Sequence, residues 1–154
     1  MRRRGIPLAA LVCLVAVAAF AADWMLMGTW KLNEGKSKLT PGSAKNHTVV
    51  YTAVGKKVRV TVDGTDPDGK PTHNEWVGAF DGKEYPVTGD PNQDIRSYTK
   101  VNDRTLSLTI KKAGEVTITG RIVASRDGKS RTVTLTGTDN TGKKFTNIAV
   151  YDRQ

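Results

Sequence analysis

The sequence predicts an all-β domain, an up-and-down antiparallel β-barrel of about 8–10 strands. One observation is composition, because the chain after residue 21 holds 19 Thr and 13 Val but only 7 Ala and 6 Leu. β-Branched residues favour the pleated sheet and lose side-chain freedom in a helix. A second observation is periodicity, since apolar residues repeatedly alternate with polar ones, as in a half-buried strand.

The alternating segments define the predicted strands. Val58, Val60 and Val62, for example, fall on one face of a strand, with Arg59 and Thr61 on the other. Such a strand has one buried face and one wet face, as antiparallel sheets commonly do. Ten segments of this kind cover residues 29–33, 47–54, 57–64, 72–80, 83–87, 94–101, 104–111, 115–125, 130–138 and 143–151.

Turn residues between these segments predict how the strands connect. Asp-Gly pairs occur at 68–69, 81–82 and 127–128, and such pairs tolerate the positive φ of tight hairpins. The spacing of the turns is close to the interval of about 8–12 residues that is typical of a sandwich or barrel. Short turns between consecutive strands favour a meander, and a meander of this many strands removes its edges by closing into a barrel.

The first 21 residues have the three zones of a secretory signal peptide. Arg2, Arg3 and Arg4 form a cationic start, residues 8–20 are an unbroken apolar run, and Ala19-Phe20-Ala21 offers small residues at a cleavage site. The alternative is a membrane anchor, but a span needs roughly 18 or more apolar residues. We therefore expect a cleaved signal peptide over 1–21, a single barrel domain over 22–154, and a secreted or periplasmic protein.

Cleavage also changes the charge and the cysteine content. Removing three arginines from a chain of net charge +9 leaves +6, and Cys13, the single cysteine, is removed as well. The mature protein is thus expected to have no disulfide and no thiol chemistry. Its 21 Lys and Arg are spread over nearly every hairpin, without the dense stripe that nucleic-acid binding needs. We expect a monomer with no nucleic-acid partner and at most a weak contact with an anionic envelope surface.

Motifs for metal and cofactor chemistry are absent from the sequence. His47 and His73 are the two histidines, and no cysteine remains to complete a zinc cluster. The sequence has no glycine-rich phosphate loop, Gly-x-Ser-x-Gly elbow or dinucleotide fingerprint. We therefore expect no metal and no cofactor.

Several motifs resemble a known group. The stretch 28–42 opens with Gly28-Thr29-Trp30, and it is followed by the stretch 81–89 and by the ending 150–152. In these motifs the chain is similar to small secreted bacterial proteins with a lipocalin-like domain, and Gly-x-Trp also opens lipocalins and fatty-acid-binding proteins, the calycin group. The resemblance implies a barrel in which Trp30 closes one end, with Arg153 or Arg121 as a cation–π partner. The chain differs from fatty-acid-binding proteins in having no helical apolar periodicity before His47.

The preferred function is binding of a small apolar or amphipathic molecule inside the barrel. Barrels of this size either fill their interior with side chains or leave room for one small molecule. We expect Gly78, Gly120 and Gly137 to leave space, and Arg96 and Tyr98 share a face on which an anionic head group fits. The candidate ligand-binding residues are Tyr51, His73, Trp76, Phe80, Arg96 and Tyr98.

Two alternatives stay open. One is a small hydrolase or isomerase that uses His73 with Glu75 or Asp81 as acid–base residues, because a carboxylate beside an imidazole serves such chemistry near neutral pH. Trp76 and Phe80 belong to an apolar stripe on the other strand face, which leaves open whether His73 faces the interior or the solvent. The other alternative is a structural or interaction protein of the cell envelope with a packed interior.

Overall fold

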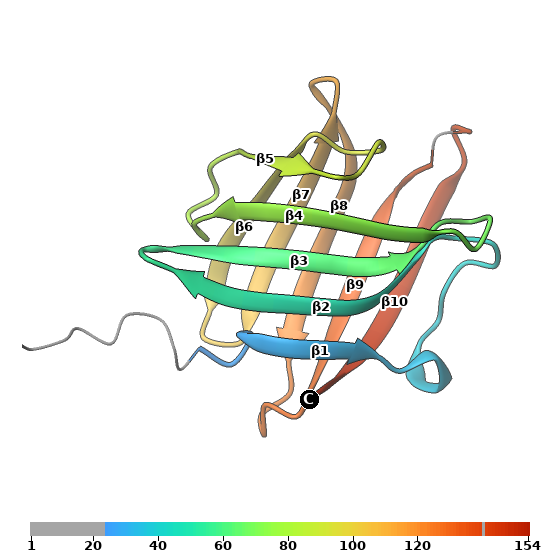
Figure 1. Ribbon diagram of the computed structural model, residues 1–154. Coiled ribbons are helices and arrows are strands. Elements are labelled where there is room, and N and C mark those ends of the chain that lie inside the picture. The colour runs from blue at the N-terminus through green and yellow to red at the C-terminus, as the bar shows by residue number, and fades with distance from the viewer. Residues whose placement is uncertain (1–23, 140) are drawn as a thin grey trace, which may run out of the picture.

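The computed structural model describes residues 24–139 and 141–154 and shows a closed antiparallel barrel of ten strands (Figure 1). Each strand pairs with the next one along the chain, and β1 pairs with β10 to close the barrel. The strands are β1 Gly28–Leu32, β2 Lys45–Val54, β3 Lys57–Thr65, β4 Pro71–Gly78, β5 Tyr85–Thr88, β6 Ile95–Asn102, β7 Thr105–Lys112, β8 Glu115–Ala124, β9 Ser130–Thr138 and β10 Lys144–Arg153.

The predicted all-β, up-and-down barrel is confirmed, and every predicted strand end lies within two residues of the observed one. The expected signal peptide over 1–21 lies outside the described residues. In the part of the chain that the structure describes, no helix is both long and apolar enough to cross a membrane.

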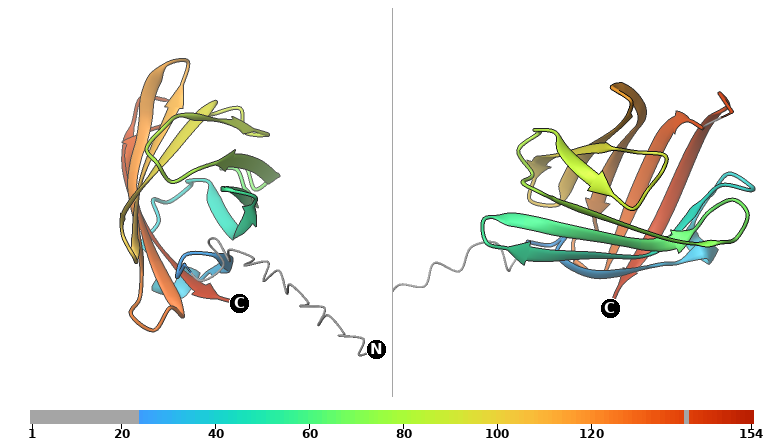
Figure 2. Two further views of the ribbon diagram at one scale, coloured as in Figure 1. Left: turned by 90° about the vertical axis from the view of Figure 1, so that its left-hand side faces the viewer. Right: turned by 45° about the horizontal axis from the view of Figure 1, so that its top comes forward.

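Two walls make up the barrel. Strands β6 to β10 stand side by side in one wall, and β2 to β4 cross them at a steep angle in the other (Figures 1 and 2). Side chains alternate across each strand, so that Val58, Val60 and Val62 of β3 are buried inside while Arg59 is exposed outside. The interior is thus lined by one residue in two from every strand.

One end of the barrel, which we call the closed end, is where β1 begins and β10 ends. The segment 24–27 fills it, with Leu26 and Met27 buried. The indole Nε1 of Trp30 donates to the Leu26 carbonyl at 2.9 Å. Arg153 holds the segment from outside by donating to the carbonyl oxygens of Met25 and Gly128. The first turn of the described chain therefore acts as a plug.

The opposite end, which we call the open end, has no helical lid formed by residues 24–139 or 141–154. The connection from β1 to β2 contains a single turn of 3-10 helix, η1 Glu34–Lys36, which is the one helical element in the described ranges. Thr40 donates its backbone N–H to the Asn147 side chain at 2.7 Å. Leu39 packs partly buried against the core. The connection thus lies against β10 and covers only part of this end.

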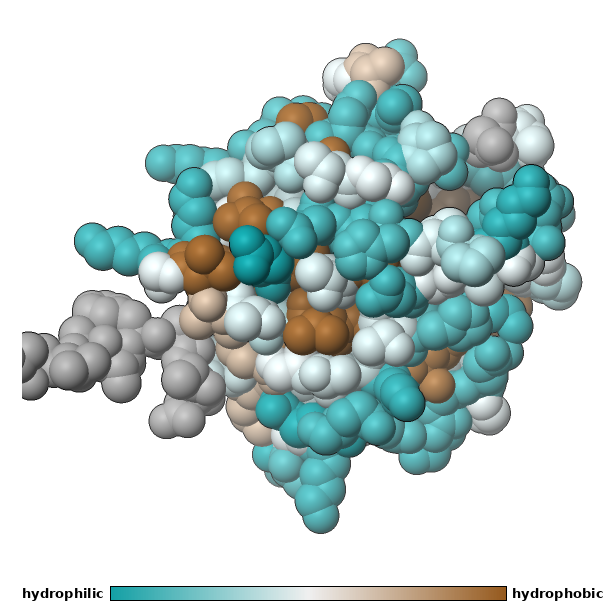
Figure 3. Space-filling view, in the orientation of Figure 1, coloured by the Kyte–Doolittle hydropathy of each residue, from teal (hydrophilic) through white to brown (hydrophobic). Residues whose placement is uncertain are grey.

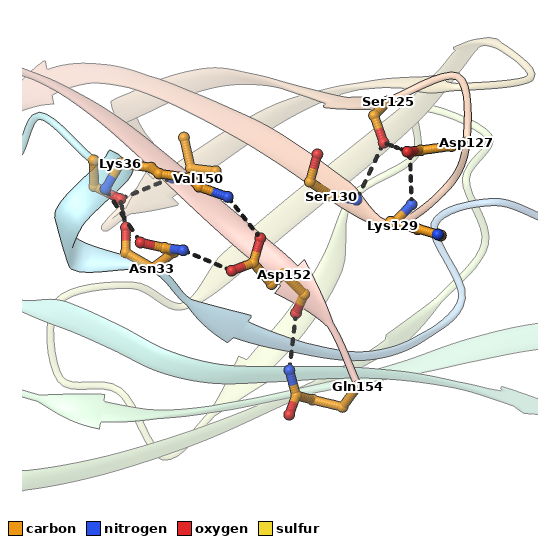
Figure 4. A network of polar contacts seen from close by, with 10 residues as sticks. Asn33, Lys36, Ser125, Asp127, Lys129, Ser130, Val150, Asp152 and Gln154 are labelled. Carbon is orange, nitrogen blue, oxygen red and sulfur yellow. Dashed lines mark hydrogen bonds and ion pairs between the residues drawn. The ribbon is translucent and has the colours of Figure 1, made fainter.

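Polar contacts fix that connection to β10 (Figure 4). Asn33 donates to the Asp152 carboxylate at 2.6 Å, and the backbone N–H of Val150 donates to the Ser37 hydroxyl at 2.9 Å. The same figure shows the neighbouring β8–β9 turn, in which Asp127 accepts from the Ser125 hydroxyl and the Lys129 backbone. The β1–β2 connection is therefore positioned both by these side chains and by a backbone bridge between Lys38 and Ile148 of β10.

Candidate functional site in the barrel interior

An aromatic cluster fills the middle and the closed half of the barrel. Trp76, which is fully buried, stacks on Phe80 with ring centroids 6.1 Å apart and lies edge-on to Tyr98 at 4.8 Å. Tyr51 joins the cluster at 6.5 Å from Tyr98, and Trp24 of the plug lies 5.0 Å from Phe80. The structure thus brings together four of the predicted ligand-binding residues, Tyr51, Trp76, Phe80 and Tyr98.

Arg96, another predicted residue, is also inside and is 4% exposed. Its Nη2 donates to Asn74 Oδ1 at 3.0 Å and to Gln93 Oε1 at 2.8 Å, its Nε donates to the same Gln93 oxygen, and its Nη1 lies 3.4 Å from the Tyr98 hydroxyl. Each nitrogen of the guanidinium therefore has an acceptor. Arg96 is held in place by four hydrogen bonds to residues of β4, of β6 and of the β5–β6 loop.

Burial raises the pKa values of two interior phenols, those of Tyr98 and Tyr151. Burial raises the pKa of Tyr98 above its usual value, with a further increase from the nearby Tyr51. Burial likewise raises the pKa of Tyr151 to about 12. Tyr98 and Tyr151 therefore present neutral hydroxyl groups, which donate and accept hydrogen bonds, at neutral pH.

Arg131 is a buried interior residue that sequence reasoning missed as a candidate for the site, as it missed the inward-facing Ile118, Leu135 and Phe145. It is 2% exposed, and its Cζ lies 4.9 Å from the ring centres of Trp30 and Tyr151 and 4.8 Å from that of Tyr51. A signal was available, because Arg131 has the same strand parity as Val133 of the apolar stripe. A cation on the buried face of a predicted strand indicates an interior charge.

The closing tryptophan has a second cation over its ring. The Arg153 guanidinium lies 4.6 Å from the Trp30 ring centre, which places one of the two expected partners beside it. Arg121, the other expected partner, is exposed on the outer face of β8, because its strand parity is opposite to that of the buried Ile122. Trp30 thus packs against Arg131 and Arg153.

The glycines do not leave space, contrary to our expectation. A Cβ at Gly78 would lie 2.5 Å from Trp76 Cζ2 and 2.6 Å from Tyr85, so aromatic rings occupy that volume. The Leu135 side chain occupies the corresponding volume at Gly120. At Gly137 this volume is occupied by the Thr117 carbonyl oxygen and the Ile118 side chain of β8. Each glycine permits the close approach of a neighbour, so the barrel is packed at Gly78 near the closed end, at Gly120, and at Gly137 near the open end.

The open half differs from the closed half in its packing. Its inward-facing apolar side chains Ile118, Leu135 and Phe145 are only partly buried. Deeper in the barrel, Val133 and Ala149 are buried and belong to the core. Figure 3 shows apolar surface set back among polar side chains on the upper right of this face. Solvent therefore reaches apolar surface inside the barrel from this end.

Two hollows lie on the wall formed by β8, β9 and β10. One, of about 370 Å³, lies at the rim of the open end, and its lining includes Ile118, Phe145 and Lys144. The other, of about 380 Å³, lies on the outer face of the wall and is lined largely by threonines. The first hollow is shallow and includes two of the inward-facing apolar residues, Ile118 and Phe145, together with threonines of the outer face.

His73, Glu75 and Asp81 do not form an acid–base group. His73 and Glu75 have the outward parity of β4, where His73 Nδ1 lies 2.6 Å from Asp63 and Glu75 lies 3.2 Å from Arg59. Asp81 instead accepts from the Tyr85 hydroxyl at 2.9 Å. The placement of His73 among the interior residues is therefore wrong, because its side chain points away from Trp76. No group of three or more His, Cys, Asp or Glu at metal-binding distance occurs among the described residues.

Comparisons with known proteins add little to this geometry. No protein-family model and no curated protein sequence matches the chain. Among solved structures, the chain is similar to a redesigned β-barrel bound to the small molecule DFHBI, with 19% identity, a TM-score of 0.43, and coverage of 84% of this chain and 95% of that one. At this level of similarity the ligand of that barrel says nothing about the ligand of this one.

Proposed function

We propose that this protein is a secreted or periplasmic binding barrel that takes a small apolar or amphipathic molecule into the open half of its interior. The observation that carries the proposal is the partial exposure of the inward-facing Ile118, Leu135 and Phe145. Concave apolar surface that remains accessible to solvent is the common property of small-molecule sites. Export is inferred from the signal-like residues 1–21, and the resemblance to secreted bacterial lipocalin-like proteins supports it.

The floor of the interior suits a ligand with one polar end. Tyr51, Tyr98 and Arg131 lie beneath the apolar lining, and they provide hydroxyl and guanidinium groups within an aromatic surround. Apolar walls bind the larger part of such a ligand, and a few polar groups orient it. The acid–base alternative is not proposed, because the structure pairs His73, Glu75 and Asp81 with different residues outside the interior.

Native mass spectrometry tests the proposal directly. The protein is expressed with its own signal sequence, purified without detergent, and measured before and after denaturation. We expect an added mass of a small molecule that disappears on denaturation. In parallel, the neutral probe N-phenyl-1-naphthylamine is titrated into the protein, and its fluorescence is expected to increase on binding.

A matched pair of variants locates the binding. Leu135 faces inward and Thr134, its neighbour on β9, faces outward. Leu135→Glu puts a charge on the apolar interior surface and is expected to weaken probe binding at least tenfold, whereas Thr134→Glu leaves it unchanged. A bare protein mass together with no probe binding by the wild type would overturn the proposal.

A further inference from the structure

The two ends of the barrel differ in charge. Each end holds seven Lys or Arg among its connections and the terminal residues of its strands. The open end also has seven Asp or Glu in these positions and is neutral, whereas the closed end has four and a net side-chain charge of +3. The closed end is therefore the more positive of the two.

The basic side chains of the closed end are not neutralised by acids of the described chain. None of the seven forms an ion pair in the part of the chain that the structure describes. Two of the four acids are paired with other lysines, Glu84 with Lys111 and Asp103 with Lys100. At the open end, by contrast, two of the seven lysines have a carboxylate partner. The closed end therefore offers its cations to a partner of negative charge.

Four of these seven side chains are exposed on turns. The other three make contacts within the protein, since Lys57 lies over the Tyr85 ring, Arg104 donates to the Ala124 carbonyl, and Arg153 holds the plug. The four exposed residues, on the β2–β3, β4–β5 and β8–β9 connections, are Lys56, Lys83, Arg126 and Lys129.

Apolar side chains are exposed beside these cations. Val54 ends β2 and is 37% exposed, and Val101 lies next to the β6–β7 turn and is 48% exposed. Trp24 and Met25 of the plug are partly buried at the same end, where Lys100 Nζ lies 5.1 Å from the Trp24 ring centre. Attachment to a bilayer surface is strengthened both by attraction of cations to anionic lipids and by burial of apolar groups in the headgroup boundary. The closed end has both kinds of group.

The chain reaches the closed end directly from its apolar N-terminal run. The described chain begins at this end (Figure 1), and four residue steps separate Phe20, the last residue of the run, from Trp24. An extended chain covers at most about 14 Å in four steps. An apolar run held in a membrane, as a signal peptide is during export, therefore keeps the closed end at the lipid surface and directs the open end away from it.

We infer that the closed end is a docking surface for the anionic headgroups of a phospholipid bilayer. The exposed cations of the turns contact the lipid phosphates, and Val54 and Val101 enter the headgroup boundary between them. The open end remains free on the side away from the membrane. This surface is separate from the interior site, so the inference does not depend on whether the barrel binds a ligand.

Vesicle sedimentation with two pairs of lysine variants tests the surface. In low salt, the protein purified after export is expected to bind vesicles of equal parts phosphatidylglycerol and phosphatidylcholine, and not vesicles of phosphatidylcholine alone. Each Lys or Arg near an anionic surface strengthens binding by about fivefold. Lys56→Gln combined with Lys129→Gln is therefore expected to weaken binding at least tenfold.

A second pair at the open end is the matched control. Lys70→Gln combined with Lys143→Gln removes the same charge and is expected to change binding less than twofold. Like Lys56 and Lys129, these lysines are exposed, and each of the four follows a turn glycine with positive φ. The two double variants thus differ in the end of the barrel that they alter.

Three results would overturn the inference. Equal losses in the two double variants would show attraction to the overall charge of the protein and not to the closed end. Equal binding to the two kinds of vesicle would show that anionic headgroups are not recognised. Binding to neither kind, including the case in which the protein binds an anionic cell-wall polymer instead, would show that the bilayer is not the partner. Binding of N-phenyl-1-naphthylamine tests the interior site separately in each case.

A pair of single-cysteine variants measures the orientation on the membrane. The chain after residue 21 has no cysteine, so Val101→Cys and Val116→Cys each take one environment-sensitive fluorophore. The two valines are 48% and 54% exposed, and Val116 lies beside the β7–β8 turn at the open end. On anionic vesicles the emission of the label at position 101 is expected to shift to the blue, while that of the label at position 116 is unchanged. A shift at both positions, at neither, or at 116 alone would contradict docking through the closed end.

Discussion

Arg96 and Asn74 join β6 to β4 across the intervening strand, with Nη2 of the arginine donating to Oδ1 of the asparagine at 3.0 Å. β5 lies between these strands and pairs in register with each of them at only two positions. The bond therefore connects β4 and β6 inside the barrel, at the place where the strand pairing through β5 is shortest. A hydrogen bond to a charged group contributes about 1.5–3 kcal/mol when both partners are buried.

Removing this tie is expected to destabilise the barrel. Asn74→Ala deprives a buried guanidinium of one acceptor, and we expect the free energy of unfolding to fall by about 1.5–3 kcal/mol. Urea unfolding at constant slope measures the change. Asn92→Ala, at an exposed position in the β5–β6 loop, is the control and is expected to stay within about 0.5 kcal/mol of the wild type. Equal midpoints for the two variants would contradict the role of the tie.

The buried Tyr151 predicts a loss of stability in alkali. Its pKa is raised from 10.0 to about 12 by burial, so the folded state favours the neutral phenol. The resulting stabilisation is present in full below pH 10 and is lost as the pH rises through 12. From the shift we expect it to be about 2–3 kcal/mol. Free energies of unfolding measured between pH 8 and 12 should fall less steeply in Tyr151→Phe, and parallel curves would refute the assignment.

Replacing Gly137 even by alanine is predicted to destabilise the barrel. A Cβ there would meet the Thr117 carbonyl oxygen and would lie 2.9 Å from Ile118 Cγ1, so a methyl group forces β8 and β9 apart. Gly137→Ala should lower the free energy of unfolding by about 1–3 kcal/mol. Gly35→Ala is the control, because its Cβ would meet only the Asn33 side chain at 3.6 Å. Thermal unfolding that ranks the two variants equally would show that the space is available after all.

His73 is predicted to be dispensable for ligand binding. Its imidazole lies on the outer face of β4 against Asp63, on the opposite side of the strand from Trp76. His73→Ala should therefore bind N-phenyl-1-naphthylamine with the wild-type dissociation constant. A loss of affinity greater than threefold in a variant with an unchanged melting temperature would return His73 to the site.

The strands were predictable because an antiparallel strand with one buried and one solvent-exposed face alternates apolar and polar residues along its sequence. Val58 to Val62 and the neighbouring segments carry that signal directly, and the turns at Asp-Gly pairs separate them. Burial of Arg96 with Tyr98 followed from the same parity. What one strand presents to the interior is thus readable from its own residues.

What several strands share was not predictable in this way. The volume beside Gly120 belongs to Leu135 of the adjacent strand, and the cage around Arg131 takes Tyr51 from β2 and Trp30 from β1. These relationships depend on register and on barrel closure, which alternation within one strand does not contain. The sequence indicates which residues face the interior, but it does not indicate which residues of other strands they contact.

Closure of the barrel also sets an order of events during folding. Nine of the ten strand pairs join consecutive strands and form from local hairpins, whereas β1 with β10 joins distant parts of the chain. The rings and guanidiniums around Trp30 come from β1, β2, β9 and β10, so they meet only when this last pair forms. A partly folded chain, however many hairpins it has completed, therefore lacks the aromatic and cationic floor of the interior, and under the proposed function we expect ligand binding to begin only when β1 pairs with β10.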